Sequence, residues 1–491
     1  MKKMFIAGKW VNGHSSQVTQ IINPATGEEI DTVSCASEMD VDRAIQCAKL
    51  QSSDEGEWKN MAPGDRSKVL LRIAELIHEK SEEISRLETL NQGKTLVDSR
   101  FDVELGAEFF KSMAGMTGFI SGQTFDYKKG LHVMTIREPL GVCGIIVPWN
   151  YPFYIMAEYT SQALAAGNTI VCKPSEITPL TAIALFEIFE EAGVPKGAAN
   201  LLLGKSSVIG NAITHSHNID KVVFIGSTKI GREVMKASAE SNFKPLSLEL
   251  GGKSPFIVFE DADMDTALDY AGLSIFMGAG QTCTAGSRML LQDSIYDEFL
   301  ERFLGYVKTI KLGSGLDEGT MMGPLVSEDH MKKVLEFIEE GKNEGARIVC
   351  GGRRACVTGY EKGFFVEPTV FTDVTNDMKI VQEEIFGPVL TVQKFYSEED
   401  AIKLANSTVY GLAAGIFTND NGRVLRMSRA VEAGKIYVNN YFTEINEAPC
   451  SALKQSGIGE EMGLLGLEGY TKIKQVNIST TLEPAHFFEI K

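Results

Sequence analysis

A cysteine in the middle of the chain stands in a segment that suits nucleophilic chemistry. Cys283 lies in GQTCTAGSR, whose glycines let the backbone turn sharply and approach a ligand closely. A thiol held in such a turn can direct its sulfur and its own N–H at one carbonyl group. A structural role for the same cysteine is the alternative, and this segment alone does not decide between them.

Two further polar residues stand at predicted strand ends. Glu249, in SLELGGKSP, leads into a double glycine and is either a turn residue or a partly desolvated general base with a raised pKa. Asn150, in PWN, follows an apolar run and is either a helix cap or an amide donor for an oxyanion. Active-site groups of doubly wound sheets lie at the carboxyl ends of strands, which fits both functional roles.

Two other strand-to-helix loops suit a nucleotide. Lys173 and Glu176, in KPSE, can hold the hydroxyls of a ribose or form a solvated turn. Gly226 and Ser227, in FIGSTKIG, stand where a strand becomes a helix, which is a suitable place for a phosphate. The loop is not the GxGxxG fingerprint of dinucleotide-binding proteins.

The elements that must position these residues alternate between strands and helices. Apolar, β-branched runs separated by helical segments are typical of a parallel sheet covered on both faces. Four such runs predict a doubly wound, Rossmann-like nucleotide-binding domain: GVCGIIV, TIVCKP, NLLLG and KVVFIGS. Five more strand-like runs predict a second α/β domain over about 251–454: FIVF, MLLQ, VLTVQKF, AGIFT and KIYVNN.

Helix signals in the first half are equally readable. Apolar residues recur at three- and four-residue steps from Pro63 until Gly93, which predicts a helical run that stops at the glycine. Thr178 is predicted to cap a helix with Pro179 at its first position and Gly193 at its end. The segment KIKQVNIST near the C-terminus alternates like an edge strand, which a partner subunit can protect.

Composition excludes several classes of function. The chain has 491 residues, 44% of them apolar, and a net charge of −17, which argues against nucleic-acid binding. No apolar stretch is long enough for a membrane span, and no secretory signal is visible. The eight cysteines include no CxxC pair and the histidines show no zinc spacing, so we expect reduced thiols, a cytoplasmic protein and no metal site.

Seven motifs in order resemble the NAD(P)-dependent aldehyde dehydrogenase superfamily: GVCGIIVPWNYP, VCKPSEITPL, FIGSTKIG, LELGGKSP, GQTCTAGSR, EEIFGPV and KQSGIG. The resemblance covers nearly the whole chain, and Cys283 follows Glu249 by 34 residues, as in that family. It implies an α/β chain with three parts. These are a Rossmann-like NAD-binding domain (1–117 and 140–250), a catalytic domain (251–454) and a small β element (118–139 and 455–491) that forms a homodimer or homotetramer.

The resemblance also assigns roles to the candidate catalytic residues. Cys283 would add to an aldehyde to give a thiohemiacetal, and hydride transfer to the cofactor would leave a thioester. The amide of Asn150 and the N–H of Cys283 would hold the oxyanion. Glu249 would activate the water that releases the carboxylic acid, and its presence favours hydrolysis over transfer to coenzyme A.

Cofactor contacts follow from the resemblance in the same way. Lys173 and Glu176 resemble the binders of the adenine ribose, and a carboxylate there favours NAD over NADP. The remaining contacts are Trp149 in the cofactor wall, Gly226 and Ser227 at the pyrophosphate, Glu384 at the nicotinamide ribose and Phe386 beside the ring.

The substrate tunnel departs from the family pattern. Cys450, Glu158 and Glu444 occupy positions that are often aromatic, and Tyr151 completes the predicted lining. The lost aromatic residues argue against long-chain or aromatic aldehydes and against the cage expected for betaine aldehyde. With Asp102 as a possible third acid, two substrates stay open: a cationic amino-aldehyde, or a small hydroxy-aldehyde such as lactaldehyde or glycolaldehyde bound by Glu444. Glu158 facing solvent at the tunnel mouth is a simpler alternative.

Two other classes of function remain as alternatives. One is a non-catalytic structural or binding protein with the same fold, which the retained Cys283, Glu249 and Asn150 argue against. The other is a cofactor-independent cysteine esterase, but no histidine lies within 45 residues of Cys283 to suggest a Cys–His pair.

Overall fold

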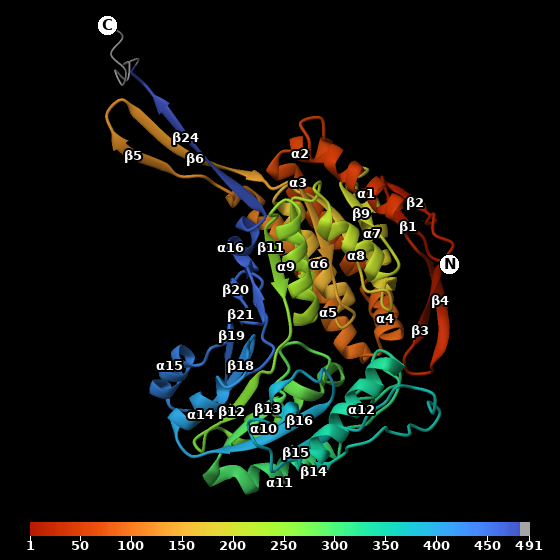
Figure 1. Cartoon of the computed structure of the whole chain (residues 1–491), viewed down its shortest axis with the longest axis vertical. Coiled ribbons are helices and arrows are strands. Elements are labelled where there is room, and N and C mark those ends of the chain that lie inside the picture. The colour runs from red at the N-terminus through yellow and green to blue at the C-terminus, as the bar shows by residue number, and fades with distance from the viewer. Residues whose placement is uncertain (482–491) are drawn as a thin grey trace.

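The structure is a computed structural model that describes residues 1–481. Two large sheets, each with its own hydrophobic cluster, form two bodies, and a three-stranded arm projects from them (Figure 1). The chain is therefore α/β with two mostly parallel sheets, as the sequence predicts.

The first sheet has the strand order β2-β1-β9-β8-β7-β10-β11-β22. Its five central strands, β9 to β11, are parallel, while β1 and β22 pair antiparallel with them. Strands β7, β8 and β10 are buried at every residue, which explains their continuous apolar sequences. The strands are β1 (Met4–Ile6), β2 (Lys9–Val11), β7 (Val142–Ile146), β8 (Thr169–Lys173), β9 (Ala199–Leu201), β10 (Lys221–Ile225), β11 (Leu246–Glu249) and β22 (Gly457–Ile458).

The order of the parallel strands reverses between β7 and β10. Strands β8 and β9 extend the sheet on one side of β7, and β10 and β11 extend it on the other. In such doubly wound sheets, ligands bind outside the carboxyl ends of the strands at this reversal. The loops after β7 and β10 contain Asn150 and Ser227, so the topology places both residues at the predicted ligand site.

Helices pack around this sheet in two groups. Helix α6 packs on α5 and α7, whereas α8 packs on α1 and α9. The helices of this body are α1 (Glu38–Gln51), α2 (Glu57–Asn60), α3 (Pro63–Glu79), α4 (Ser81–Gln92), α5 (Leu96–Met116), η1 (Thr117–Phe119), α6 (Pro152–Ala165), α7 (Leu180–Glu191), α8 (Ser206–His215) and α9 (Thr228–Glu240).

Two helix boundaries differ from the sequence-based prediction. The run from Pro63 to Gly93 is two helices, because Lys80 leaves the helical conformation with φ −105° and ψ 11°. Gly93 ends the second helix with φ +100°, as predicted. Thr178 does not cap α7, which begins at Leu180 after Pro179. The Leu180 N–H instead donates to Asn91 Oδ1 of α4 at 3.2 Å, so a neighbouring helix supplies the cap.

The second sheet has the strand order β14-β15-β16-β13-β12-β18-β19, and only β14 is antiparallel to its neighbour. The predicted apolar runs of this region all form its strands, with boundaries that shift by one or two residues. The strands are β12 (Pro255–Val258), β13 (Arg288–Gln292), β14 (Arg347–Cys350), β15 (Thr369–Thr372), β16 (Val389–Phe395), β18 (Ala413–Phe417) and β19 (Lys435–Val438).

Helices of the second body flank this sheet. Asp263 caps α10 through its side chain, as the acidic turn before that helix suggests. The helices are α10 (Met264–Phe276), η2 (Met277–Gly280), η3 (Asp293–Ile295), α11 (Tyr296–Val307), α12 (Glu328–Asn343), α13 (Lys379–Gln382), α14 (Glu398–Ala405) and α15 (Asn421–Ala430).

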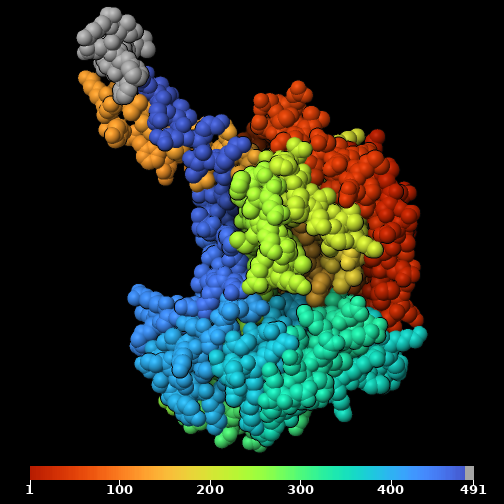
Figure 2. Space-filling view, viewed as in Figure 1, coloured from red at the N-terminus to blue at the C-terminus, as the bar shows by residue number. Residues whose placement is uncertain are grey.

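The arm consists of β5 (Thr124–Lys128), β6 (Leu131–Pro139) and β24 (Thr471–Ser479) in the order β24-β6-β5. Strand β24 is an edge strand, as predicted, and Figure 2 shows the arm standing clear of both bodies. The remaining short elements are β3 (Val18–Asn23) with β4 (Glu28–Ser34), β17 (Tyr410–Gly411) with β21 (Leu453–Lys454), β20 (Cys450–Ser451) with β23 (Glu460–Glu461), and α16 (Gly463–Glu468). Over residues 1–481, no helix combines the length and apolar character that crossing a membrane requires.

Candidate active site

A left-handed turn holds Cys283 between η2 and β13. Ala279 and Gly280 have φ angles of +57° and +70°. A Cβ atom on Gly280 would stand 2.3 Å from the carbonyl oxygen of Gly387, so only glycine fits this position. The glycine-rich segment therefore shapes the approach to the cysteine, as the sequence suggests.

The electrostatic surroundings of Cys283 favour the neutral thiol. Burial, followed by the nearby carboxyl groups of Glu249 and Glu384, raises the pKa of the Cys283 thiol. Lys435 and the Thr284 N–H act in the opposite direction. A thiol in these surroundings becomes an effective nucleophile only when its proton is removed, so the site needs a base near the sulfur.

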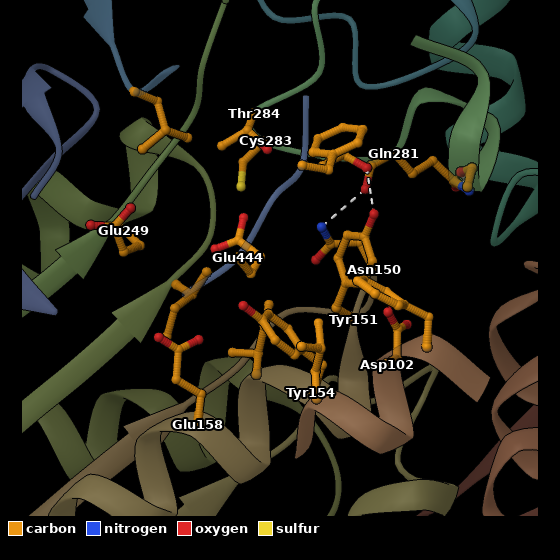
Figure 3. A pocket seen from close by; sticks show the side chains of 18 of the residues that line it. Asp102, Asn150, Tyr151, Tyr154, Glu158, Glu249, Gln281, Cys283, Thr284 and Glu444 are labelled. Carbon is orange, nitrogen blue, oxygen red and sulfur yellow. Dashed lines mark hydrogen bonds between the residues drawn. The ribbon is translucent and has the colours of Figure 1, made fainter. Parts of the chain in front are cut away.

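Asn150 lies beside Cys283 and is fixed by a hydrogen bond. Its side chain is 4% exposed, and its Nδ2 donates to the carbonyl oxygen of Gln281 at 3.0 Å (Figure 3). Tyr151, not Asn150, precedes the first residue of α6, and no side chain caps that helix. The helix-cap alternative for Asn150 is therefore wrong, and its second N–H is available for another acceptor.

Glu249 ends β11 and points its carboxyl group into the same cavity as Cys283 (Figure 3). Burial, and then the charges of Glu461 and Glu158, raise the pKa of Glu249 well above its usual value, while Lys435 lowers it. A carboxyl group with a raised pKa can take a proton from water near neutral pH, which is the requirement for a general base.

A cavity of about 150 Å³ extends from Cys283 between α5, α6 and β19. All four residues predicted for the substrate tunnel line it: Tyr151, Glu158, Glu444 and Cys450. The prediction of a wall poor in aromatic residues is wrong, because five aromatic side chains line the cavity: Phe101, Tyr151, Tyr154, Tyr159 and Phe442. The sequence predicts Tyr151 in this lining but not the other four, which lie on α5 (Phe101), on α6 (Tyr154 and Tyr159) and in the loop after β19 (Phe442) and converge only in the fold.

The carboxyl groups of this cavity differ in their partners. Glu444 accepts from Lys435 Nζ at 2.5 Å and from Tyr437 Oη at 3.1 Å. Asp102 forms a buried ion pair with Lys94, and burial raises the pKa of Asp102 to about 7. Both acids therefore already have partners within the protein, although each Glu444 oxygen keeps a second lone pair that a substrate hydroxyl could use.

Glu158 is the exception among these acids. It is 4% exposed, so the alternative that it faces solvent at the tunnel mouth is wrong. Its Oε1 is buried and has no hydrogen-bond partner in the part of the chain that the structure describes.

A second cavity, of about 210 Å³, opens at the reversal point of the first sheet. It brings together five of the residues predicted to bind the cofactor: Trp149, Gly226, Ser227, Glu384 and Phe386. The Trp149 and Phe386 rings pack edge to face, with centroids 5.2 Å apart. Glu384 Oε1 accepts from the Gly252 N–H at 2.8 Å, and burial raises the pKa of Glu384 to about 7.

The other two predicted cofactor residues lie outside the lining of this cavity. Lys173 ends β8, which neighbours β7, and its Nζ donates to Ser206 Oγ at 2.5 Å. Burial lowers the pKa of Lys173 to about 8, and the charge of Glu176 raises it, so the two side chains are close. Their position at the carboxyl edge of the sheet agrees with the predicted nucleotide-binding edge.

The two cavities meet at Cys283. Asn150 and Cys283 line both of them, together with Ile155 and Ile225. A thiol at such a junction can contact one molecule in each cavity, which suits a transfer between two bound reactants.

Sequence reasoning missed several polar residues of the site. His330 packs on Trp149, its Nε2 donates to the Phe386 carbonyl at 2.7 Å, and burial lowers its pKa to about 4. Lys435 lies beside Cys283, and Glu461 accepts a hydrogen bond from the Tyr159 hydroxyl. Lys435 follows Gly434, and Glu461 lies between Gly459 and Gly463, so both stand beside glycines as Cys283 does, whereas His330 has no glycine next to it.

Comparisons with known proteins agree with this geometry. A protein-family sequence model described as "Aldehyde dehydrogenase family" matches residues 10–476. A betaine aldehyde dehydrogenase of Bacillus subtilis (strain 168) is 44% identical over 486 residues, 99% of each chain. An aldehyde dehydrogenase of Aspergillus niger is 44% identical and covers 96% of this chain and 94% of its own. The crystal structure of a betaine aldehyde dehydrogenase from Staphylococcus aureus in complex with NAD+ has a TM-score of 0.97 at 40% identity, covering 99% of this chain and 97% of that one.

Proposed function

The chain belongs to the aldehyde dehydrogenase family, and on that premise we propose that it uses NAD to oxidise a small, positively charged aldehyde to the carboxylic acid. The junction of two cavities at Cys283 carries this proposal. The aldehyde occupies the cavity of Glu249 and Glu158, and the dinucleotide occupies the cavity of Trp149 and Glu384.

The residues of the second cavity suit a dinucleotide. Trp149 and Phe386 offer apolar ring surfaces, and the start of α9 after Ser227 offers backbone N–H groups to a phosphate. One carboxylate oxygen of Glu384 is bonded to Gly252, which leaves the other for a ribose hydroxyl. Similar proteins have been solved in complex with NAD+, and NAD is the cofactor of this chain. When bound, it accepts the hydride of the aldehyde.

The chain's own groups account for the other steps. The Cys283 thiol loses its proton to solvent water, and the thiolate adds to the aldehyde carbon. The oxygen that becomes negative accepts from the Asn150 amide and the Cys283 N–H. Loss of hydride from the same carbon leaves a thioester on Cys283. Glu249 takes a proton from water, whose oxygen attacks the thioester, so that the carboxylic acid leaves and the thiol is restored.

The charge and lining of the first cavity support the substrate class. Acidic groups outnumber basic ones among its lining residues, and five aromatic rings can face a cation. Two similar proteins are betaine aldehyde dehydrogenases. Betaine aldehyde, whose quaternary ammonium group meets both conditions, is therefore the first candidate. Lactaldehyde and glycolaldehyde are the second candidates, through the unpaired carboxyl group of Glu158.

A panel of aldehydes tests the proposal. NADH formation is followed with betaine aldehyde, an amino-aldehyde, glycolaldehyde, lactaldehyde, propanal and succinate semialdehyde. We expect the cationic aldehydes to give the largest kcat/KM, an acid as the product, and no turnover without NAD. A clear preference for succinate semialdehyde, or faster turnover with acyl-CoA formation when coenzyme A is added, would contradict the proposal.

The arm supplies a surface for self-association. Its strands are largely exposed and carry apolar side chains, namely Phe125, Tyr127, Ile473 and Ile478. Within residues 1–481, β24 pairs with β6 on one side and has no strand partner on the other. We infer that a second copy of this chain covers the arm, and sedimentation at several protein concentrations tests this inference.

A further inference from the structure

The carboxyl group of Glu158 is unusual among the polar groups of the substrate cavity. Glu158 is on α6, is 4% exposed, and points toward the interior of the cavity that also contains Cys283 (Figure 3). Its buried Oε1 has no hydrogen-bond partner within residues 1–481. Buried polar atoms almost always have a partner in folded proteins, so an unpaired oxygen in a ligand cavity indicates a partner that the ligand brings.

Neighbouring acids have partners within the protein. Glu444 is bonded to Lys435, and Asp102 is paired with Lys94. Glu461 accepts from the Tyr159 hydroxyl. Because these three are satisfied, Glu158 is the carboxyl group that best suits a new partner inside the cavity.

The groups that face Glu158 come from several elements. On its own helix these are Tyr154 and Tyr159. From other elements they are Glu249 of β11, Lys435 of β19, Glu444, Cys450 of β20, Glu461 of β23 and Tyr470. Burial, and then the charges of Glu461 and Glu444, raise the pKa of Glu158 well above its usual value, whereas Lys435 lowers it. Burial and these charges therefore favour the protonated form of Glu158 in the empty cavity.

We infer that Glu158 selects the substrate by pairing its carboxylate with a positively charged substituent of the aldehyde; this inference rests on the proposed aldehyde oxidation. As the cation enters, Glu158 releases its proton to solvent. The resulting carboxylate then forms an ion pair with the positive charge of the substrate. Where Glu158 is protonated before binding, one proton leaves as the cation binds, so the total charge is conserved. The aromatic rings of Tyr154 and Phe442 line the same cavity and can contact the remaining faces of the cation.

Two aldehydes of nearly equal shape isolate the effect of charge. Betaine aldehyde and 3,3-dimethylbutanal differ in that a quaternary nitrogen replaces a quaternary carbon. In the wild-type enzyme we expect kcat/KM for betaine aldehyde to exceed that for 3,3-dimethylbutanal by about tenfold or more. The ratio should rise with pH, because each bound cation releases a proton and higher pH favours that release.

Variants then assign the effect to one residue. In Glu158→Gln, which keeps the size of the side chain, the ratio should fall by about tenfold and lose its pH dependence. Glu461→Gln is the comparison variant: it keeps Glu158 and so should keep the preference for the cation. The rise of the ratio should shift to lower pH, because the charge of Glu461 raises the pKa of Glu158. Unfolding temperature and quenching of Trp149 fluorescence by NAD check that each variant folds and binds the cofactor.

The outcomes separate this inference from the proposed function. A wild-type ratio near or below one, or a Glu158→Gln variant that keeps the wild-type ratio, overturns the role of Glu158 while aldehyde oxidation stands. If Glu158→Gln does not fold, the wild-type ratio and its pH dependence decide the matter alone. If the wild type forms NADH from no aldehyde, the proposed function fails and this inference fails with it.

Discussion

The side-chain amide of Asn150 is 3.0 Å from the carbonyl oxygen of Gln281, two residues before Cys283. This hydrogen bond ties the loop after β7 of the first body to the cysteine turn of the second body. The amide is thus held beside the sulfur before any substrate arrives, and fixed donors of this kind stabilise a developing oxyanion most effectively.

Removal of this amide should slow the reaction far more than it weakens binding. We expect Asn150→Ala to lower kcat for aldehyde oxidation by about 10²- to 10³-fold, the usual effect of losing one oxyanion donor. Steady-state NADH formation measures kcat, and quenching of Trp149 fluorescence measures NAD binding. A fall in kcat of less than about threefold would show that Asn150 does not face the oxyanion.

Glu249→Gln should separate the two halves of the reaction. Without the base, the thioester forms, but its hydrolysis should be about 10²- to 10⁴-fold slower than in the wild type. A stopped-flow trace should then show one equivalent of NADH per active site, followed by slow turnover. If Glu249 were needed for the first half-reaction instead, the burst itself would disappear.

The reactivity of Cys283 should rise steadily with pH. Burial, Glu249 and Glu384 hold the pKa of its thiol above the ordinary value, so the thiolate remains the minor species near neutral pH. Below its pKa, the thiolate fraction of a thiol rises about tenfold per pH unit. Alkylation of the Cys283 peptide by iodoacetamide, followed by mass spectrometry between about pH 6 and 8, should show this slope. A plateau near pH 7 would mean that the thiol is already ionised.

Gly280, in the turn that holds Cys283, should not tolerate a side chain. Gly280→Ala combines a φ of +70° with a Cβ only 2.3 Å from the Gly387 carbonyl oxygen. We expect it to lower the free energy of unfolding by about 2 kcal/mol or more and to reduce turnover at Cys283. Gly305→Ala is the control, since Gly305 lies in α11 with no atom within 4 Å of the new Cβ. That change should raise stability by up to about 1 kcal/mol, as measured by urea unfolding.

Cofactor choice should depend on Glu176. A carboxylate at this position would accept a hydrogen bond from a ribose hydroxyl but repel a 2′-phosphate. Glu176→Ser should therefore lower the ratio of kcat/KM with NAD to kcat/KM with NADP, mainly by lowering KM for NADP. Efficiencies with the two cofactors, measured at saturating aldehyde, test the change. A wild-type enzyme that uses NADP as well as NAD would contradict this role.

The sequence predicts the chemistry of the site better than the walls of its cavity. Cys283, Glu249 and Asn150 stand beside glycines, prolines and strand ends, and these local features are visible in the sequence. Lys435 and Glu461 reach the cavity only because β19 and β23 pack near α6 and β11, and packing of this kind leaves no local pattern. The break at Lys80 was missed because the apolar periodicity continues across it. The rest of the aromatic lining beyond Tyr151 was missed because Phe101 of α5, Tyr154 and Tyr159 of α6 and Phe442 of the loop after β19 come together only in the fold.

Within residues 1–481, the two cavities that we assign to the aldehyde and the dinucleotide share four lining residues, all at the junction, so the two molecules would reach Cys283 by separate routes. Either molecule can exchange with solvent while the other stays in place. A compound that blocks the entrance of one cavity should therefore be a noncompetitive inhibitor with respect to the reactant that binds in the other cavity.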